Sequence, residues 1–524
     1  MSGWAVGDGY RVYPPRMNIT SEVVDRHVEE GRGGNAAVRW SGGSWTYQEF
    51  QGEINGLAAG LADLGVGKGD FILVHTRNHP RSCAAVFAAL KLGAVPTLSA
   101  SMLKEPEIEY ILENSGARTV FAMDAVCEPL RSLKAKGAFE NLIIVDADDA
   151  GAGAIAYLDV MKAAGDVPAA DTDAMDPAFM LYSSGTTGKP KGILHAHRWI
   201  ITVGDPILVQ MKYRHDDIVL SPGEYSFMGA FGHAFMFPLY GGASIATLSE
   251  RGTPENAFAF VEELGVTIFS FVPTFYRMAL AEPGLKDRFD LSSLRFMCTM
   301  GEQLGTTACE QWAEVYGIPL YESYGVAEIE VMIGNGPDYP VKPGSIGRVL
   351  PGYKVALLDD ELNEVGPGED GVFMIHRSDP GLYLGYYKQV DRWRKQHRGD
   401  WYYTSDVMHR DEDGYYWYHG RQDDIFKSRG YLIAPQEIED VVLKHPLVAE
   451  VAVTGIAGET RGKTIAAFVV LTEGNEGSDA LAQEIVEFAG EKLARYKVPE
   501  TMNFVDAIPK NPVGKLLRRV LVAG

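Results

Sequence analysis

Residues 182–192 have the sequence YSSGTTGKPKG, and this stretch decides which architecture the rest of the chain must support. Its glycines permit positive φ angles, so that successive backbone N–H groups can converge on an anion. Its hydroxyl and ammonium groups add hydrogen-bond donors and positive charge. The stretch therefore predicts a phosphate-binding loop. The residues of this loop are Ser183, Ser184, Gly185, Thr186, Thr187, Gly188, Lys189 and Lys191.

The glycine spacing differs from that of a nucleotide-hydrolysing P-loop. That pattern has four residues between its glycines and a Ser or Thr after its lysine. Here two residues separate Gly185 from Gly188, and Pro190 follows Lys189. Because proline disfavours helical dihedral angles in the preceding residue, Lys189 is expected to be extended. A P-loop kinase or ATPase is therefore disfavoured.

Charge and composition exclude several classes of partner. The formal net charge is −22 over 524 residues, and such a surface repels nucleic acid and anionic lipid at long range. Four scattered cysteines do not suggest a disulfide framework or a zinc site. The sequence has no evident signal segment, and no apolar run approaches the roughly 20 residues of a membrane helix. We expect a cytoplasmic protein without membrane insertion.

Segment patterns predict a multidomain α/β fold. Helical spacing over residues 54–70 is followed by an apolar strand over 71–76, and 83–100 repeats a helix and a strand. Strands that alternate with helices indicate parallel sheets. Residues 345–376 instead contain short alternating runs with Gly and Pro turns, which predict a small antiparallel or β-barrel-like subdomain. Residues from about 421 onward predict an α+β unit.

Seven further segments follow the order of motifs in one family. They are KLGAVP (91–96), VPTFYR (272–277), MGEQL (300–304), YGVAE (324–328), YYTSD (402–406), GRQDDIFKSRGYLIAPQEIE (420–439) and PKNPVGK (509–515). With the loop, they make nearly the whole chain similar to the adenylate-forming superfamily. That superfamily contains the acyl- and aryl-CoA synthetases, nonribosomal peptide adenylation domains and luciferases. The finer resemblance is to benzoate- and aminobenzoate-CoA ligases and medium-chain acyl-CoA synthetases, with RGKTIAAFVVL (461–471) contributing.

The resemblance implies an architecture of two domains. Residues 1–420 would form an N-terminal adenylation domain of two parallel-type α/β subdomains and the small β-barrel-like one. Residues 421–524 would form a small mobile α+β domain, with a hinge near Asp423.

The resemblance also implies an AMP-forming carboxylate–CoA ligase that uses ATP, Mg²⁺ and coenzyme A. A carboxylate attacks the α-phosphate of ATP to give an acyl-adenylate and pyrophosphate, and CoA then displaces AMP. Negative charge spreads over the phosphates in the first step, so cations and N–H donors are needed there.

Catalytic and nucleotide-binding residues follow from the matched motifs. Lys515 and Glu328 would be catalytic, with Glu328 and Thr186 as ligands of Mg²⁺. Lys515 would reach the reacting carboxylate in the first half-reaction and withdraw when the C-terminal domain rotates. Gly430 would then line the tunnel for CoA. Beyond the loop, the implied nucleotide ligands are Gly301, Glu302, Gln303, Glu322, Ser323, Tyr324, Gly325, Asp406 and Arg421.

The acid-binding pocket is expected around the aromatic segment 227–237. Its candidate residues are Ala230, Phe231, Gly232, His233, Met300, Val326 and Val331. These side chains offer no evident carboxylate for an α-amino group, which favours an aromatic (benzoate-type) or medium-chain acid over an amino acid. Val331 stands where the benzoate enzymes tend to have His.

Two departures from the family pattern keep alternatives open. Ala327 replaces the usual Thr, which removes a hydroxyl expected near the α-phosphate, and Ser405 replaces a Gly. The first alternative is a stand-alone enzyme that adenylates an acid and loads a carrier protein. The second is a nucleotide-binding pseudoenzyme, which rests on Ala327. The expected partners are the acid, ATP and CoA; a homodimer and a lysine-acylating regulator at Lys515 stay open.

Overall fold

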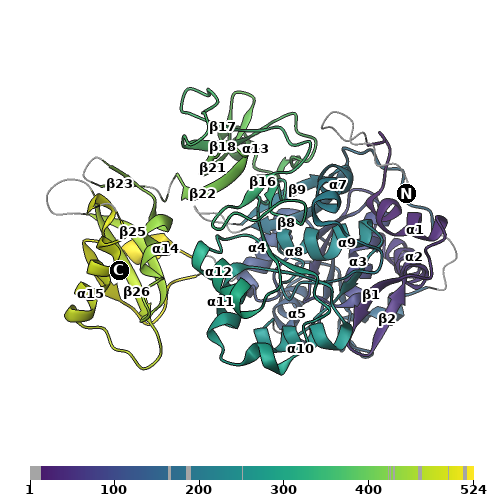
Figure 1. Ribbon diagram of the computed structural model, residues 1–524. Helices are drawn as coiled ribbons and strands as arrows, with labels where there is room; N and C mark the ends of the chain where they lie inside the picture. Colours follow the sequence, from purple (N-terminus) through teal and green to yellow (C-terminus); the bar gives the residue numbers. More distant parts are fainter. Residues whose placement is uncertain are drawn as a thin grey trace.

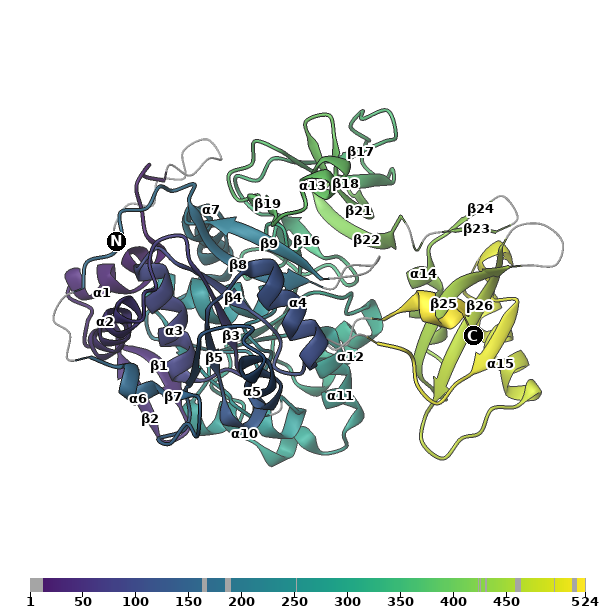
Figure 2. The same cartoon turned by 180° about the vertical axis from the view of Figure 1, so that it is seen from behind.

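The computed structural model describes residues 13–162, 167–183, 190–250, 252–422, 424, 426–428, 431–457, 463–493, 495–510 and 516–523. Figure 1 shows a large body built from the N-terminal and central parts of the chain, with a smaller C-terminal lobe beside α11 (Pro273–Ala281) and α12 (Thr306–Val315). Figure 2 shows the same division from behind. No helix among the described residues is long and apolar enough to cross a membrane.

An eight-stranded, mostly parallel sheet forms one half of the large body. Its strands, in spatial order, are β19 (Gly385–Tyr386), β9 (Lys191–Ala196), β8 (Pro177–Ser183), β4 (Val95–Leu98), β3 (Phe71–His75), β5 (Thr119–Ala122), β6 (Asn141–Ile144) and β7 (Ile155–Ala156). β3 and β5 are apolar runs that are buried almost throughout, as expected of parallel strands covered on both faces. The strand predicted over residues 71–76 is confirmed.

The helices of this half precede β3 or lie between its strands along the chain, and one of them is α2 (Tyr47–Asp63). Thr46 begins α2 with a capping box, because its hydroxyl accepts from the Glu49 N–H and the Glu49 carboxylate accepts from the Thr46 N–H. The N-terminal elements and the helices among the strands are η1 (Ser21–Asp25), α1 (Arg26–Glu29), α2 (Tyr47–Asp63), α3 (Pro80–Lys91), α4 (Glu105–Ser115), η2 (Asp124–Val126), α5 (Glu128–Ala135) and α6 (Tyr157–Val160).

A second, fourteen-stranded sheet forms the other half. A parallel stretch runs through β14 (Leu320–Tyr324), β13 (Phe296–Thr299), β12 (Ile268–Phe271), β10 (Ile218–Leu220), β11 (Ser244–Ala246) and β1 (Ala36–Trp40), with β2 (Gly43–Thr46) antiparallel at the edge. Its helices are α7 (Trp199–Met211), α8 (Met228–Phe231), η3 (Gly232–Met236), α9 (Phe237–Tyr240), α10 (Pro254–Leu264), α11, η4 (Leu285–Arg288) and α12. The two parallel-type subdomains are thus both present.

The predicted small β subdomain continues the second sheet. Its antiparallel strands are β15 (Ile333–Gly334), β16 (Gly347–Val349), β22 (Tyr415–Arg421), β21 (Trp401–Arg410), β18 (Gly371–His376) and β17 (Val355–Leu358), with β20 (His397–Arg398) beside β21. Helix α13 (Val390–Lys395) precedes β20. The described strands pair in an open series from β14 to β17 and do not close into a barrel. Strand β15 joins this series directly to the large sheet.

The C-terminal unit has its own hydrophobic core. Ile433, Ile438, Val442, Val453 and Ile485 are buried together there. The α+β composition is as predicted. Its elements are β23 (Phe426–Ser428), β24 (Tyr431–Ile433), α14 (Pro435–Val442), β25 (Val448–Ala457), β26 (Lys463–Leu471), α15 (Asp479–Gly490), η5 (Arg495–Lys497), β27 (Thr501–Phe504) and α16 (Arg518–Ala523).

Gly60 in α2 permits close packing against Val160, the last residue of α6. A Cβ atom at Gly60 would stand 1.8 Å from the carbonyl oxygen of Val160. We expect Gly60→Ala to destabilise the protein by about 1–3 kcal/mol, because backbone on both sides must shift to relieve the overlap. The midpoint of thermal unfolding measures this.

Gly52→Ala is the matched control in the same helix, since a Cβ atom there would meet nothing within 4 Å. It should raise the stability by up to about 1 kcal/mol through helix propensity. Equal midpoints for the two variants would contradict the packing argument.

Candidate active site

The predicted phosphate loop connects two paired strands. Ser183 at the end of β8 pairs with Lys191 at the start of β9, so the loop joins the strands of an antiparallel hairpin. The Ser183 hydroxyl is buried without a hydrogen-bond partner among the described residues. The other predicted residues of the loop, and three of the C-terminal region, lie outside the described residues: Ser184, Gly185, Thr186, Thr187, Gly188, Lys189, Asp423, Gly430 and Lys515.

Glu328 lies beside the base of this hairpin. Lys191 Nζ donates to Glu328 Oε1 at 2.7 Å, and the Tyr386 hydroxyl donates to the same oxygen at 2.6 Å. The Glu328 side chain is only 5% exposed. Burial alone would raise the pKa of Glu328, but the Lys191 ammonium and the two hydrogen bonds hold that pKa below its usual value. The carboxylate is therefore ionised at neutral pH, next to the loop.

The backbone around Glu328 is held by three hydrogen bonds from other elements. His195 Nε2 lies 3.0 Å from the Ala327 carbonyl, the Tyr383 N–H donates to the Glu328 carbonyl at 2.8 Å, and Trp199 Nε1 donates to the Ile329 carbonyl at 3.0 Å. Burial lowers the pKa of His195 to about 4. Since a carbonyl can only accept, the neutral ring must carry its proton on Nε2. Position 327 thus contributes its main chain to the site.

Tyr386 is a candidate site residue that the motifs do not reveal, and it contacts Tyr402 of the YYTSD motif. Their hydroxyls lie 3.2 Å apart, and burial raises the pKa of both. Tyr386 lies in a segment, GLYLGYY (381–387), that falls between the family motifs. The tyrosines of this segment are the only feature of its sequence that could indicate a site, and tyrosines are also common in protein cores. The pairing of β19 with β9 brings Tyr386 to Lys191.

Asp406 and Tyr324, both expected nucleotide ligands, contact one another. The Tyr324 hydroxyl donates to Asp406 Oδ2 at 2.6 Å, and the Tyr418 hydroxyl donates to Oδ1 at 3.1 Å. Arg421 is the partner of Asp406 in the register of β21 and β22. Ser405 has a φ of +70°, a region that glycine adopts without strain. This explains why Gly is the commoner residue there.

The predicted adenine-binding residues line the ends of β13 and β14. Gly301 has a φ of +91°, and the Glu322 carboxylate accepts from the Leu304 N–H at 2.9 Å. Burial raises the pKa of Glu322 to about 7. Glu302 accepts from the Thr274 hydroxyl at 3.2 Å, and Gln303 Oε1 is buried without a partner among the described residues.

Ser323 and Gly325 flank Tyr324. Ser323 pairs with Gly334 in the adjoining strand. A Cβ atom at Gly325 would lie 1.3 Å from the Glu330 carbonyl oxygen, so no side chain fits there.

The predicted acid-pocket residues lie at a short π-helix. Ala230 and Phe231 end α8, and Gly232 and His233 begin η3. Such π-helical turns are frequent at functional sites. The Phe231 ring is buried 4.6 Å from that of Phe179. Val331 is buried in the same core, and Met300 and Val326 pack against it while partly exposed.

Glu330 is a buried carboxyl group that we did not predict in this region. Its Oε1 lies 3.0 Å from Nδ1 of His233. Burial raises the pKa of Glu330 well above its usual value and lowers that of His233 to about 3, so both groups are uncharged. Glu330 Oε2 and His233 Nε2 have no partner among the described residues. The uncharged carboxyl group of Glu330 therefore lies beside Gly232 and His233, two of the expected pocket residues.

Family comparisons agree with this geometry. The model of the AMP-binding enzyme family matches residues 24–387, and that of the AMP-binding enzyme C-terminal domain matches residues 437–515. The two matches cover most of the large body and most of the C-terminal unit.

Individual relatives span nearly the whole chain. The uncharacterized acyl-CoA ligase YtcI of Bacillus subtilis is 31% identical over 97% of this chain and 96% of its own length. The benzoate-CoA ligase of Thauera aromatica is 30% identical over 96% of this chain and 95% of its own. The crystal structure of the anthranilate CoA ligase AuaEII with anthranoyl-AMP superposes with a TM-score of 0.90, at 29% identity and 98% coverage of both chains. The predicted resemblance to acyl- and aryl-CoA synthetases is confirmed: the chain belongs to the AMP-binding enzyme family.

Proposed function

We propose that this enzyme joins an aromatic carboxylic acid of the benzoate type to coenzyme A through an acyl-adenylate. The observation that carries the proposal is the ionised, buried Glu328 with Lys191 at the base of the glycine- and hydroxyl-rich hairpin loop. The relatives that act on benzoate and anthranilate support the aromatic class of acid. The enzyme is expected in the cytoplasm, where ATP and CoA are available.

Glu328 fits the requirements of a Mg²⁺ ligand. It is a carboxylate kept ionised despite burial, beside a loop suited to phosphates. Glu328 and Thr186 would hold the ion, which neutralises phosphate charge when bound. Lys191, 2.7 Å from Glu328, supplies a second positive charge at this point. Its flexible ammonium can turn from the carboxylate to a phosphate oxygen.

Asp406 suits the recognition of ribose hydroxyls. Tyr324 and Tyr418 each donate to one of its oxygens, which orients the carboxylate. Its strand partner Arg421 would contact the ribose and phosphate. AMP bound in this way would have a defined position relative to Glu328, since Tyr324 and Glu328 belong to one short segment.

We further propose that residues 1–420 and 421–524 act as two domains about a hinge at Asp423. Lys515 would approach the acid during adenylation, and Gly430 would make room for CoA after rotation. The two units already approach closely, since a Cβ atom at Gly305 would lie 3.4 Å from Asp440 of α14. A rotation about 423 would change this contact without disturbing either core.

ATP–pyrophosphate exchange with a panel of acids tests the function. We expect the highest kcat/KM with benzoate or aminobenzoate, at least about tenfold above octanoate and acetate, because a pocket with an aromatic wall discriminates by shape. Exchange with octanoate alone would refute the aromatic class but keep the activity. No exchange with any acid would refute both. Formation of an acyl-CoA from added CoA separates this activity from the loading of a carrier protein.

Tyr386→Phe tests the environment of Glu328. Loss of the hydroxyl removes one of the two donors that hold the pKa of Glu328 down, so that pKa should rise. Since the ionised form is needed, the acid limb of the kcat/KM profile should move to higher pH. Activity at neutral pH should fall about 10- to 100-fold, because a hydrogen bond to a charged group contributes about 1.5–3 kcal/mol.

Tyr387→Phe is the control for this variant, since the Tyr387 ring packs on Phe71, 4.8 Å between centroids. Its profile should match that of the parent protein. An unshifted acid limb in Tyr386→Phe would contradict the assignment of Glu328.

Lys515→Ala tests the two-domain proposal. Adenylation should fall by at least about 100-fold, because a charge aimed at the transition state is lost. Thioester formation from supplied acyl-adenylate should be spared. Lys510→Ala is the control, because Lys510 forms an ion pair with Glu450 at 2.6 Å. Equal losses in both half-reactions of Lys515→Ala would contradict the rotation.

A further inference from the structure

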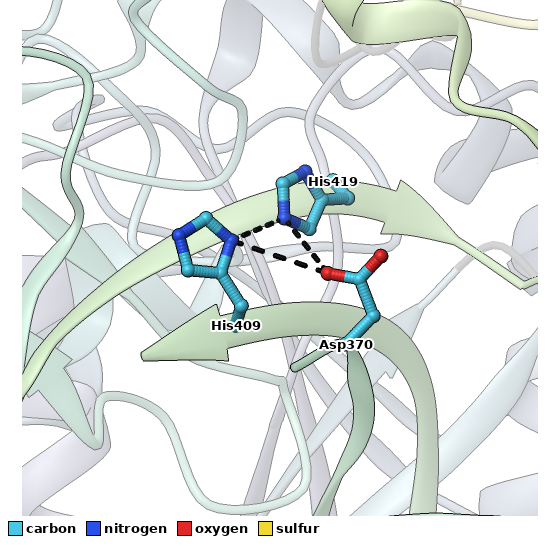
Figure 3. Close-up of side chains that lie close together, drawn as sticks. All are labelled: Asp370, His409 and His419. Carbon is cyan, nitrogen blue, oxygen red and sulfur yellow. Dashed lines mark hydrogen bonds and ion pairs between the residues drawn. The ribbon is translucent and has the colours of Figure 1, made fainter. Parts of the chain in front are cut away.

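Three side chains converge on one face of the small antiparallel sheet, outside the proposed active site. His409 lies on β21, His419 on β22, and Asp370 directly precedes β18, so that three neighbouring strands each contribute one group (Figure 3). His409 Nδ1 lies 2.6 Å from His419 Nε2. Asp370 Oδ1 lies 3.3 Å from His419 Nε2 and 4.0 Å from His409 Nδ1.

An irregularity of the sheet brings His419 to this point. Val407 pairs with Gly420 and Met408 pairs with Tyr418, which leaves His419 as the extra residue of a β-bulge. The following Gly420 has a φ of +122°, so the bend depends on glycine. Bulges re-aim side chains and are enriched next to functional sites. The convergence therefore comes from a specific backbone feature and not from chance rotamers on a flat strand.

The spacing of these donor atoms is compatible with a bound metal ion. At 2.6 Å, the two imidazole nitrogens have room between them for one proton only, so at least one of the facing nitrogens presents a lone pair. Zn–N bonds of about 2.0–2.1 Å at tetrahedral angles separate ligand atoms by about 3.3 Å. The observed separations of 2.6, 3.3 and 4.0 Å bracket this value, so small ring rotations complete the geometry.

We propose that Asp370, His409 and His419 bind a divalent transition-metal ion, with zinc as the representative. Two imidazoles and one carboxylate favour zinc, copper, nickel or cobalt over magnesium and calcium, which prefer oxygen ligands. Three protein ligands leave at least one coordination position for water or another group. Among the described residues, no other group of three His, Cys, Asp or Glu side chains brings its ligand atoms within 4.8 Å of one another. The net charge of −22 favours cation binding.

The site would tie together the strands that carry two proposed nucleotide ligands. Asp406 lies three residues before His409 on β21, and Arg421 lies two residues after His419 on β22. A bound ion would cross-link β21, β22 and the start of β18 directly ahead of the C-terminal unit. It should therefore protect the folded protein against unfolding, since an ion that binds only the folded state stabilises it.

Equilibrium dialysis of the metal-free, full-length protein against Zn²⁺ tests the proposal. We expect one ion per chain, retained in the presence of excess Mg²⁺, and a higher midpoint of thermal unfolding. His409→Ala, His419→Ala and Asp370→Asn should each weaken Zn²⁺ binding at least about tenfold and abolish the thermal shift. Asp370→Asn preserves the size of an exposed side chain and guards against a loss of folding in the histidine variants.

His376→Ala is the control, because His376 lies on β18 of the same sheet with its Nδ1 on the Ser378 hydroxyl. It should bind Zn²⁺ as the parent protein does. No retained Zn²⁺ would overturn the proposal. Retention that is unchanged in His409→Ala and His419→Ala would place the ion elsewhere, for example on a cysteine, and would overturn it equally.

Discussion

The arrangement of this enzyme depends on keeping one buried carboxylate ionised. Desolvation disfavours the charged form of Glu328, so the charge must be offset by groups that arrive from elsewhere in the chain. Lys191 and Tyr386 both belong to the first sheet, whereas Glu328 follows β14 of the second. The ion pair therefore joins the two halves of the large body where the loop between β8 and β9 begins. Loss of one partner of such a pair costs about 3–5 kcal/mol, because the other charge stays buried.

The surroundings of Glu328 hold both its backbone and its carboxylate through groups from other elements. Three hydrogen bonds from other elements hold the carbonyls of residues 327–329. The Lys191 side chain is held through its ammonium, which contacts Glu328 at 2.7 Å and the Tyr386 hydroxyl at 3.2 Å at the end of a flexible stem. The replacement of the usual Thr by Ala327 can be understood here, because the contact of His195 with the Ala327 carbonyl fixes this position through the main chain. A missing hydroxyl at position 327 removes a donor without loosening the segment that carries Glu328.

The sequence predicts the fold well, whereas contacts between segments that are distant in the sequence appear only in the structure. The apolar run FILVH predicts the buried strand that the structure has, and Lys191 and Glu328, both predicted site residues, contact one another. Tyr386 could not be predicted, because its role comes from the pairing of β19 with β9 across nearly 200 residues. The subdomain predicted as barrel-like is an open sheet that β15 joins to the large sheet, and this pairing between separate segments is not apparent from the local alternating pattern.

Glu330 shows why the choice of acid is harder to derive than the chemistry. Its carboxyl group lies against Gly232, where an added Cβ atom would come within 1.8 Å of Oε1. Its backbone has a φ of +108°, a conformation that is strained for a non-glycine residue and that concentrates at functional sites. The Glu330 carboxyl group, which is uncharged and pairs with His233, thus occupies space that a side chain at position 232 would otherwise fill. Gly232 and Glu330 are 98 positions apart in the sequence. The sequence around one residue does not predict that it contacts the other, so the shape of this region is apparent only in the folded structure.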